Sequence, residues 1–248
     1  MKPILIISLF ICLIPMACAT TNNIQERNIA EATMALGEAH LNQGNFTAAL
    51  KELLNAEKTI PNDPYLHNNL GIAYMGKEIF DLAETHFKRS LALKPDYTQA
   101  QNNLGAALLK QKKYDQAIEC YSQFSNNLLY TTPHFAFSNI GWAYLGKGEY
   151  FFAENNFLKA LNEEPYFINA IHGLASTYLE SGNPFKAEAL LGKKLAKLPR
   201  AAILHADLAK TYELMNRPDR AKEMWEQVLL FAPEASPLAL TAESRLRD

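Results

Sequence analysis

The sequence feature that most constrains the fold is a short pattern that recurs every 34 to 36 residues. Its clearest copy runs from Asn68 to Tyr74 and contains the pair Leu70-Gly71. In every copy a branched apolar residue precedes a small one, and the six small residues are Gly37, Gly71, Gly105, Gly141, Ala175 and Ala209. A period of this length is typical of stacked structural repeats and not of one globular core.

Other positions come into register when the six copies are aligned on this small residue. Alanine stands twelve residues after it in every copy, and a large apolar residue follows four places later, one turn on along the same helical face. Prolines, which cannot continue a helix, stand near the end of five copies: Pro61, Pro95, Pro165, Pro199 and Pro233. Each copy therefore predicts a helix, a tight turn and a second helix.

These positions resemble the tetratricopeptide repeat. The resemblance covers residues 30–235 and implies an all-α fold, a right-handed α-solenoid of six helix hairpins, at about 30–63, 64–97, 98–133, 134–167, 168–201 and 202–235. Residues 236–248 are expected to form a final helix, with Ser236 as its N-cap and Pro237 at its first position. A polar, solvent-exposed face would let this helix cap the solenoid.

The charge balance bears on the partners of the chain. The formal net charge is −2, and 20% of the residues are charged, as in an ordinary folded protein. A nucleic-acid-binding protein normally carries a basic stripe. We therefore expect no nucleic acid partner.

The first residues resemble a secretory signal peptide. Met1-Lys2 is a minimal positive segment, and the run from Pro3 to Met16 is almost wholly apolar. This run is short for a membrane span, which needs roughly 20 residues. Residues 18–29 are mostly polar and lack periodicity, so they predict a tether before the first repeat.

Two cleavage sites are consistent with this signal peptide. In the first interpretation, Cys18 resembles the lipid-attachment cysteine of bacterial lipoproteins, and residues 1–17 are removed. In the second, Ala17-Cys18-Ala19 is an ordinary signal-peptidase site that releases a soluble periplasmic or secreted protein. Either cleavage leaves Cys120 without a second cysteine inside the repeats, so no internal disulfide is expected.

The sequence contains no recognisable catalytic constellation. The six histidines are at least 19 residues apart, so no pair has metal-ligand spacing on one helix. There is no glycine-rich phosphate loop. We expect no enzymatic activity, no cofactor and no metal.

The resemblance also implies a binding surface. In tetratricopeptide arrays the first helix of each hairpin lines a concave groove, and the residues carried onto that groove are Tyr65, Asn68, Asn69, Ile72, Gln99, Asn102, Asn103, Phe135, Asn139 and Trp142. Side-chain amides can pair with the backbone of an extended peptide, at about 0.5–1.5 kcal/mol for each bond. Alternatively, these amides bond neighbouring helices, and Trp142 is covered by the next repeat.

The signal peptide and the repeats together resemble the type IV pilus biogenesis and stability lipoproteins of the PilF/PilW type. Leu129–Pro133 is similar to that family's Leu-Tyr-x-x-Pro linker, and Asn139-Ile140-Gly141 lies where the family has Asn-x-Gly. The resemblance implies an outer-membrane lipoprotein that faces the periplasm. It would bind an extended segment of the pilus secretin, or pilus assembly proteins, and help the secretin localise and assemble.

A second interpretation remains open at this point. The chain could be a more general periplasmic or outer-membrane scaffold that docks proteases or cell-wall enzymes. The segment 125–133, which is longer than the equivalent linkers, could be a tolerated insertion or a contact loop around Leu128–Tyr130.

Overall fold

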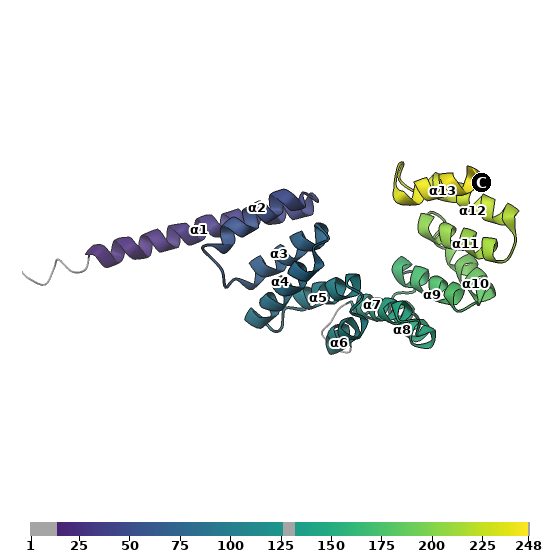
Figure 1. The fold of residues 1–248 in the computed structure, drawn as a ribbon, viewed down its shortest axis with the longest axis horizontal. Coiled ribbons are helices and arrows are strands. Elements are labelled where there is room, and N and C mark those ends of the chain that lie inside the picture. The colour runs from purple at the N-terminus through teal and green to yellow at the C-terminus, as the bar shows by residue number, and fades with distance from the viewer. Residues whose placement is uncertain (1–13, 126–131, 248) are drawn as a thin grey trace, which may run out of the picture. The chain divides into compact units, whose positions relative to one another are not determined.

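The computed structural model describes the backbone of residues 14–125 and 132–247 and the side chains of residues 23–123 and 132–247. Within these ranges the regular structure is entirely helical, and the fold is drawn in Figure 1. The helices are α1 (Ile14–Asn42), α2 (Phe46–Glu57), α3 (Pro64–Gly76), α4 (Phe80–Leu93), α5 (Thr98–Lys110), α6 (Tyr114–Ser125), α7 (Pro133–Gly146), α8 (Tyr150–Glu163), α9 (Ile168–Glu180), α10 (Pro184–Leu195), α11 (Ala202–Leu214), α12 (Pro218–Phe231) and α13 (Pro237–Arg247). The predicted all-α fold is confirmed, while the exact repeat count and the handedness stay predictions.

The helices group into two compact units that divide between Ala107 and Leu108, within α5. In the first unit α1 packs on α2, α3 packs on α4, and α2 and α1 also contact α3. In the second unit the pairs α7–α8, α9–α10 and α11–α12 pack in the same way, and α6 packs on α7.

The small residue of each copy lies where two helices meet. A methyl group added at Gly71 would lie 2.4 Å from the Phe87 ring, and one added at Gly37 would lie 2.7 Å from Leu53. Phe87 and Leu53 are fully buried. The repeated small residue therefore allows the first helix of a hairpin to approach the large apolar residue of the second.

The tight turn of each hairpin has one conformation throughout. The residue seven places after the small residue has a positive φ in every copy, at Gly44, Glu78, Lys112, Gly148, Gly182 and Asn216. One residue further on, a backbone N–H donates to the carbonyl five residues earlier, as Asn183 does to Tyr178 at 2.7 Å. This left-handed residue is the usual way to end a helix before a sharp turn.

Helix α1 begins earlier than the sequence pattern predicts. It runs without a break from Ile14 to Asn42, because neither glycine nor proline stands between residues 16 and 36. Residues 18–29, for which we expect a tether, are therefore helical, and the tether itself stays a prediction. Residues 23–29 are exposed, and Ala30 is the first buried residue among those with described side chains. In Figure 1 this purple part of α1 extends beyond α2.

The C-terminal helix α13 packs on α12 and α11. The backbone N–H of Ala239 donates to Ser236 Oγ at 3.3 Å, as expected for an N-cap. Ala242 is buried, and Leu238 and Leu246 pack beside it around Trp225. This helix thus covers the end of the second unit.

Part of the predicted linker lies outside the residues that the structure describes. Leu128–Tyr130 and most of the Leu129–Pro133 linker lie outside the described residues. In the part of the chain that the structure describes, none of the helices is both long and apolar enough to cross a membrane.

Candidate functional site

The first unit has a hollow of about 240 Å³ between the first helices of successive hairpins, α1, α3 and α5, and the segment before α5. Five residues predicted for the groove line it: Tyr65, Asn68, Asn69, Ile72 and Gln99. Glu38, Leu41, Asn42 and Tyr97 complete the lining. The repeat resemblance therefore brought together residues from two helices that do share one surface.

A capped helix start positions the aromatic side of this hollow. Asp63 Oδ1 accepts hydrogen bonds from the backbone N–H groups of Tyr65 and Leu66, at 2.8 and 2.9 Å, and Pro64 is the first residue of α3. Tyr65 remains 44% exposed and meets the Tyr97 ring edge-on, with 5.2 Å between the ring centroids. An aromatic pair of this kind, with one exposed ring and one half-buried ring, can anchor an apolar side chain.

A cation lies beside the two tyrosines. Lys94 Nζ donates to the Tyr65 hydroxyl at 2.8 Å and lies 4.9 and 5.5 Å from the centroids of the Tyr65 and Tyr97 rings. The hydrogen bond to Tyr65 raises the pKa of Lys94, and burial raises the pKa of the Tyr97 phenol. The Lys94 ammonium and the neutral Tyr97 phenol are therefore present at neutral pH, where they can meet carbonyl or carboxylate groups.

The amides of the hollow have different roles. Asn68 is almost fully buried, and its side-chain oxygen accepts a hydrogen bond of 3.0 Å from Asn103 Nδ2 on α5. This bond joins α3 to α5 and supports the helix-to-helix interpretation for Asn68. Asn102 and Asn103 are half-buried and do not line the hollow, whereas Asn69, which is only 9% exposed, and the exposed Gln99 do. Gln99 is thus the amide most accessible to a peptide, and Asn69 lies in the wall of the hollow.

The predicted groove residues of the second unit are arranged differently. Phe135 is 44% exposed and packs edge-on against Phe167 at 4.9 Å. Trp142 is half-buried and contacts Phe157 and His172, with centroids 5.5 and 5.2 Å away. Asn139 is half-buried on the same helix, α7. The contact with His172 on α9 shows that the following hairpin partly covers Trp142.

A short hydrogen bond between a histidine and a carboxylate also lies on this face of the second unit. His172 Nδ1 is 2.6 Å from the carboxylate of Asp207, which is almost fully buried on α11. His172 and Asn68 each stand three residues before the small residue of their own repeat copy. Their partners, Asp207 and Asn103, each stand two residues before the small residue of the following copy. The same pair of positions therefore joins neighbouring first helices in both units.

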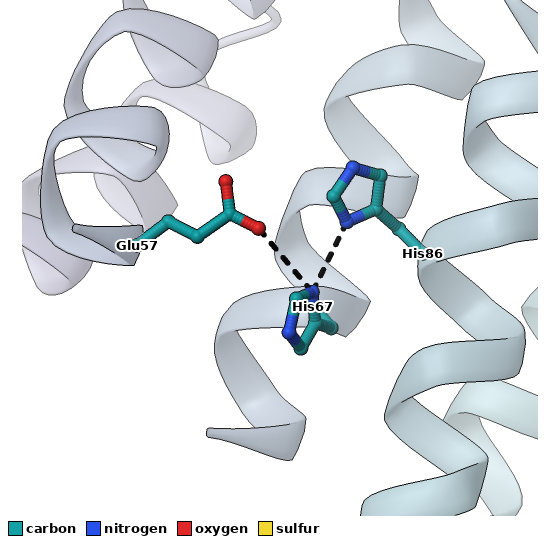
Figure 2. A group of neighbouring side chains, drawn as sticks. All are labelled: Glu57, His67 and His86. Carbon is teal, nitrogen blue, oxygen red and sulfur yellow. Dashed lines mark hydrogen bonds and ion pairs between the residues drawn. The ribbon is translucent and has the colours of Figure 1, made fainter. Parts of the chain in front are cut away.

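One cluster of side chains was not predicted from the sequence. Glu57, His67 and His86, from α2, α3 and α4, place three potential ligand atoms within 4.8 Å of one another (Figure 2). Counting spacings on one helix could not find it, because each residue lies on a different helix. A useful signal would have been that His67 and His86 belong to the two helices of one hairpin.

Comparisons with known proteins first define the class. Residues 37–77 match a TPR repeat family, and residues 98–123 match the tetratricopeptide repeat family. The helix pairs and the matches together show that the chain contains tetratricopeptide repeats.

Particular relatives follow from the same comparisons. The type IV pilus assembly protein PilF of Pseudomonas aeruginosa is 27% identical over 111 residues, which are 45% of this chain and 44% of PilF, less than half of either. The crystal structure of PilW, a type IV pilus biogenesis factor, superposes with a TM-score of 0.73 at 20% identity, over 86% of this chain and 98% of PilW. The structure of P. aeruginosa PilF superposes with a TM-score of 0.66 at 20% identity, over 90% of this chain and 99% of the PilF chain. The chain is a tetratricopeptide repeat protein that resembles PilF and PilW.

Proposed function

We propose that this chain is a non-catalytic, protein-binding adaptor of the bacterial envelope that acts in type IV pilus biogenesis. The observation that carries the proposal is the combined likeness to PilF in sequence and to PilW and PilF in fold. Tetratricopeptide solenoids act through extended surfaces that bind other proteins. In this proposal the hollow of the first unit is part of such a surface.

The finer proposal is a pilotin-like role in which the protein helps an outer-membrane secretin localise and assemble. Cys18 would carry the lipid, whose acyl chains contribute about 0.8 kcal/mol for each buried CH₂. The exposed residues 23–29 of α1 would separate the first hairpin from the membrane. Cys18→Ser should move the protein from the membrane fraction to the soluble fraction; retention in the membrane would refute lipid anchoring at this residue.

The partner would bind the hollow of the first unit as an extended segment. Tyr65 and Ile72 would hold apolar side chains, and the amides of Asn69 and Gln99 would bond its backbone. Each of these bonds contributes only about 0.5–1.5 kcal/mol, so the exposed ring of Tyr65 would provide most of the affinity.

The test is a pair of substitutions in the hollow. Tyr65→Ala with Asn69→Ala removes the aromatic anchor and one amide that lines the hollow but keeps the Asn68–Asn103 bond. We expect the double variant to fold normally and to reduce secretin multimers and surface pili at least tenfold. Tyr166→Ala is the matched control, because Tyr166 is 46% exposed, also carries a lysine over its ring, and lies outside the hollow.

The outcomes separate the proposal from its alternative. Normal multimers in the folded double variant would refute binding at this hollow. Normal multimers in a complete deletion, with changed levels of envelope proteases or cell-wall enzymes, would favour the general scaffold.

A further inference from the structure

The cluster of Glu57, His67 and His86 has the geometry of a metal site. His67 Nδ1 lies 3.1 Å from His86 Nδ1 and 3.8 Å from Glu57 Oε1. Figure 2 shows the three side chains converging from separate helices on one point beside His67. Ligands of a tetrahedral Zn²⁺ at about 2.0–2.1 Å are about 3.3 Å apart, which lies between the two observed distances.

The hydrogen bond on the far side of His67 fixes its tautomer. Its Nε2 is 2.9 Å from the carbonyl oxygen of Pro61, which can only accept a hydrogen bond. Nε2 therefore carries the proton, and in the neutral ring Nδ1 presents a lone pair to Glu57 and His86. A ring N–H bound to a backbone carbonyl is the usual arrangement behind a metal-ligating histidine.

The second ring is held in place by its neighbours. His86 stacks with His67 and with Tyr74, with centroids 5.3 Å from each. These contacts accompany the approach of its Nδ1 to within 3.1 Å of His67 Nδ1.

A hydrogen bond between the two rings does not account for the whole cluster. One ring proton can bridge the two Nδ1 atoms, but the Glu57 oxygen at 3.8 Å is beyond hydrogen-bond distance. Three electron-rich atoms thus converge with a single proton available between them. A shared cation would satisfy all three.

We propose that Glu57, His67 and His86 bind a divalent transition metal ion of the zinc class, with water as the fourth ligand. Two imidazoles and a carboxylate suit Zn²⁺. Coordination breaks no covalent bond of the chain; the His86 proton passes through solvent from Nδ1 to Nε2. The ion enters on the side of Glu57, whose side chain is 30% exposed, whereas that of His67 is 6% exposed. It would fasten the first hairpin to the second.

A second copy of the histidine provides an internal control. His205 occupies the same repeat position as His67, and its Nε2 lies 2.9 Å from the carbonyl of Pro199. The positions that correspond to Glu57 and His86 hold Leu195 and Met224, and His205 Nδ1 has no hydrogen-bond partner. The second copy therefore has the orienting bond without the ligands.

The experiment measures Zn²⁺ binding to the full-length protein, purified without a histidine tag and freed of metal with a chelator. Titration calorimetry with Zn²⁺ gives stoichiometry and affinity, and the visible spectrum with Co²⁺ reports the ligand geometry. Glu57→Gln and His86→Gln remove a ligand each, and His205→Gln removes the matched histidine. Circular dichroism checks that every variant is folded.

We expect one tightly bound Zn²⁺ for each chain, a tetrahedral Co²⁺ spectrum, and a melting temperature raised by about 5 °C in excess Zn²⁺. Glu57→Gln and His86→Gln should each weaken binding at least tenfold, while His205→Gln should bind as the wild type does. The proposal is overturned if the wild type binds no Zn²⁺ at micromolar concentration. It is equally overturned if the folded Glu57 and His86 variants bind as tightly as the wild type.

Discussion

His67 and His205 occupy the same repeat position in the two units, and the comparison shows what the repeat determines. Both rings are held by the carbonyl of a proline six residues earlier. Around His67 the next helices supply Glu57 and His86, whereas around His205 the Phe231 ring stacks at 5.6 Å and the equivalent positions are apolar. The repeat thus fixes the backbone and one hydrogen bond, and the neighbouring helices decide the chemistry.

The bonds between successive first helices differ between the units in a similar way. The first unit uses a neutral amide pair, Asn68 with Asn103, and the second uses His172 with the buried Asp207. An unpaired buried charge is far more costly than an unpaired amide. The two units should therefore respond differently to the loss of equivalent residues.

The largest expected effect comes from breaking each of these two pairs in a separate variant. His172→Ala leaves the buried Asp207 carboxylate without this partner and should lower the free energy of unfolding of the second unit by about 3 kcal/mol, the lower end for a buried pair because His172 is partly exposed. Asn103→Ala should cost the first unit about 1 kcal/mol. Urea unfolding measures both, by fluorescence of the two tryptophans in the second unit and by circular dichroism for the whole chain. Equal losses would contradict the comparison.

The position two residues before the small residue, which holds Asn103 and Asp207 in their copies, holds Gly173 in the copy on α9. This glycine allows a second test. A methyl group at Gly173 on α9 would lie 2.2 Å from the Phe157 ring, while one at Gly192 on α10 would meet nothing within 4 Å. Gly173→Ala should therefore destabilise the second unit by about 1–3 kcal/mol through overpacking. Gly192→Ala should stabilise it by up to about 1 kcal/mol, because alanine favours the helix. A neutral Gly173→Ala would show that Phe157 has room to move.

The smallest expected effect concerns the residue three places after the small residue, which is a tyrosine in four of the six copies. Two of these tyrosines, Tyr74 and Tyr178, have different neighbours. Tyr74 stacks on His86, whereas the Tyr178 hydroxyl donates to Glu154 at 2.9 Å. Burial first, and then this hydrogen bond and the carboxylate charge, raise the pKa of Tyr178.

The sign of the resulting pH dependence follows from linkage. An unfolded tyrosine ionises near pH 10. Between that pH and the higher folded pKa, the folded state keeps a proton that the unfolded state loses, so the stabilisation present below about pH 10 is lost as the pH rises. The unfolding free energy of the wild type should fall more steeply above pH 10 than that of Tyr178→Phe. Parallel curves would show that Tyr178 contributes nothing to the alkaline loss.

The sequence predicted those features that depend on neighbouring residues along the chain. Helix α3 starts at Pro64, where the second hairpin is expected to begin, because proline is well tolerated at the first position of a helix. The early start of α1 was missed, since the sequence pattern marks where packing begins and not where the helix begins.

The candidate site could be predicted only in part. The repeat register placed Tyr65, Asn69 and Gln99 on one hollow, because equivalent positions of successive repeats face the same side. Register could not determine that Asn68 and Asn103 bond one another, or that Glu57, His67 and His86 meet. Those contacts depend on which side chains of separate helices come within a few ångströms.

The most direct test of the proposed adaptor role is crosslinking in the cell from the hollow itself. A photoreactive phenylalanine analogue at position 65 of the full-length protein would be irradiated in intact cells, with the same analogue in place of Tyr166 as control, and the products identified by mass spectrometry. Our account predicts a secretin or another pilus assembly protein as the product from position 65 and its absence from position 166. Products that contain only proteases or cell-wall enzymes, or identical products from both positions, would contradict it.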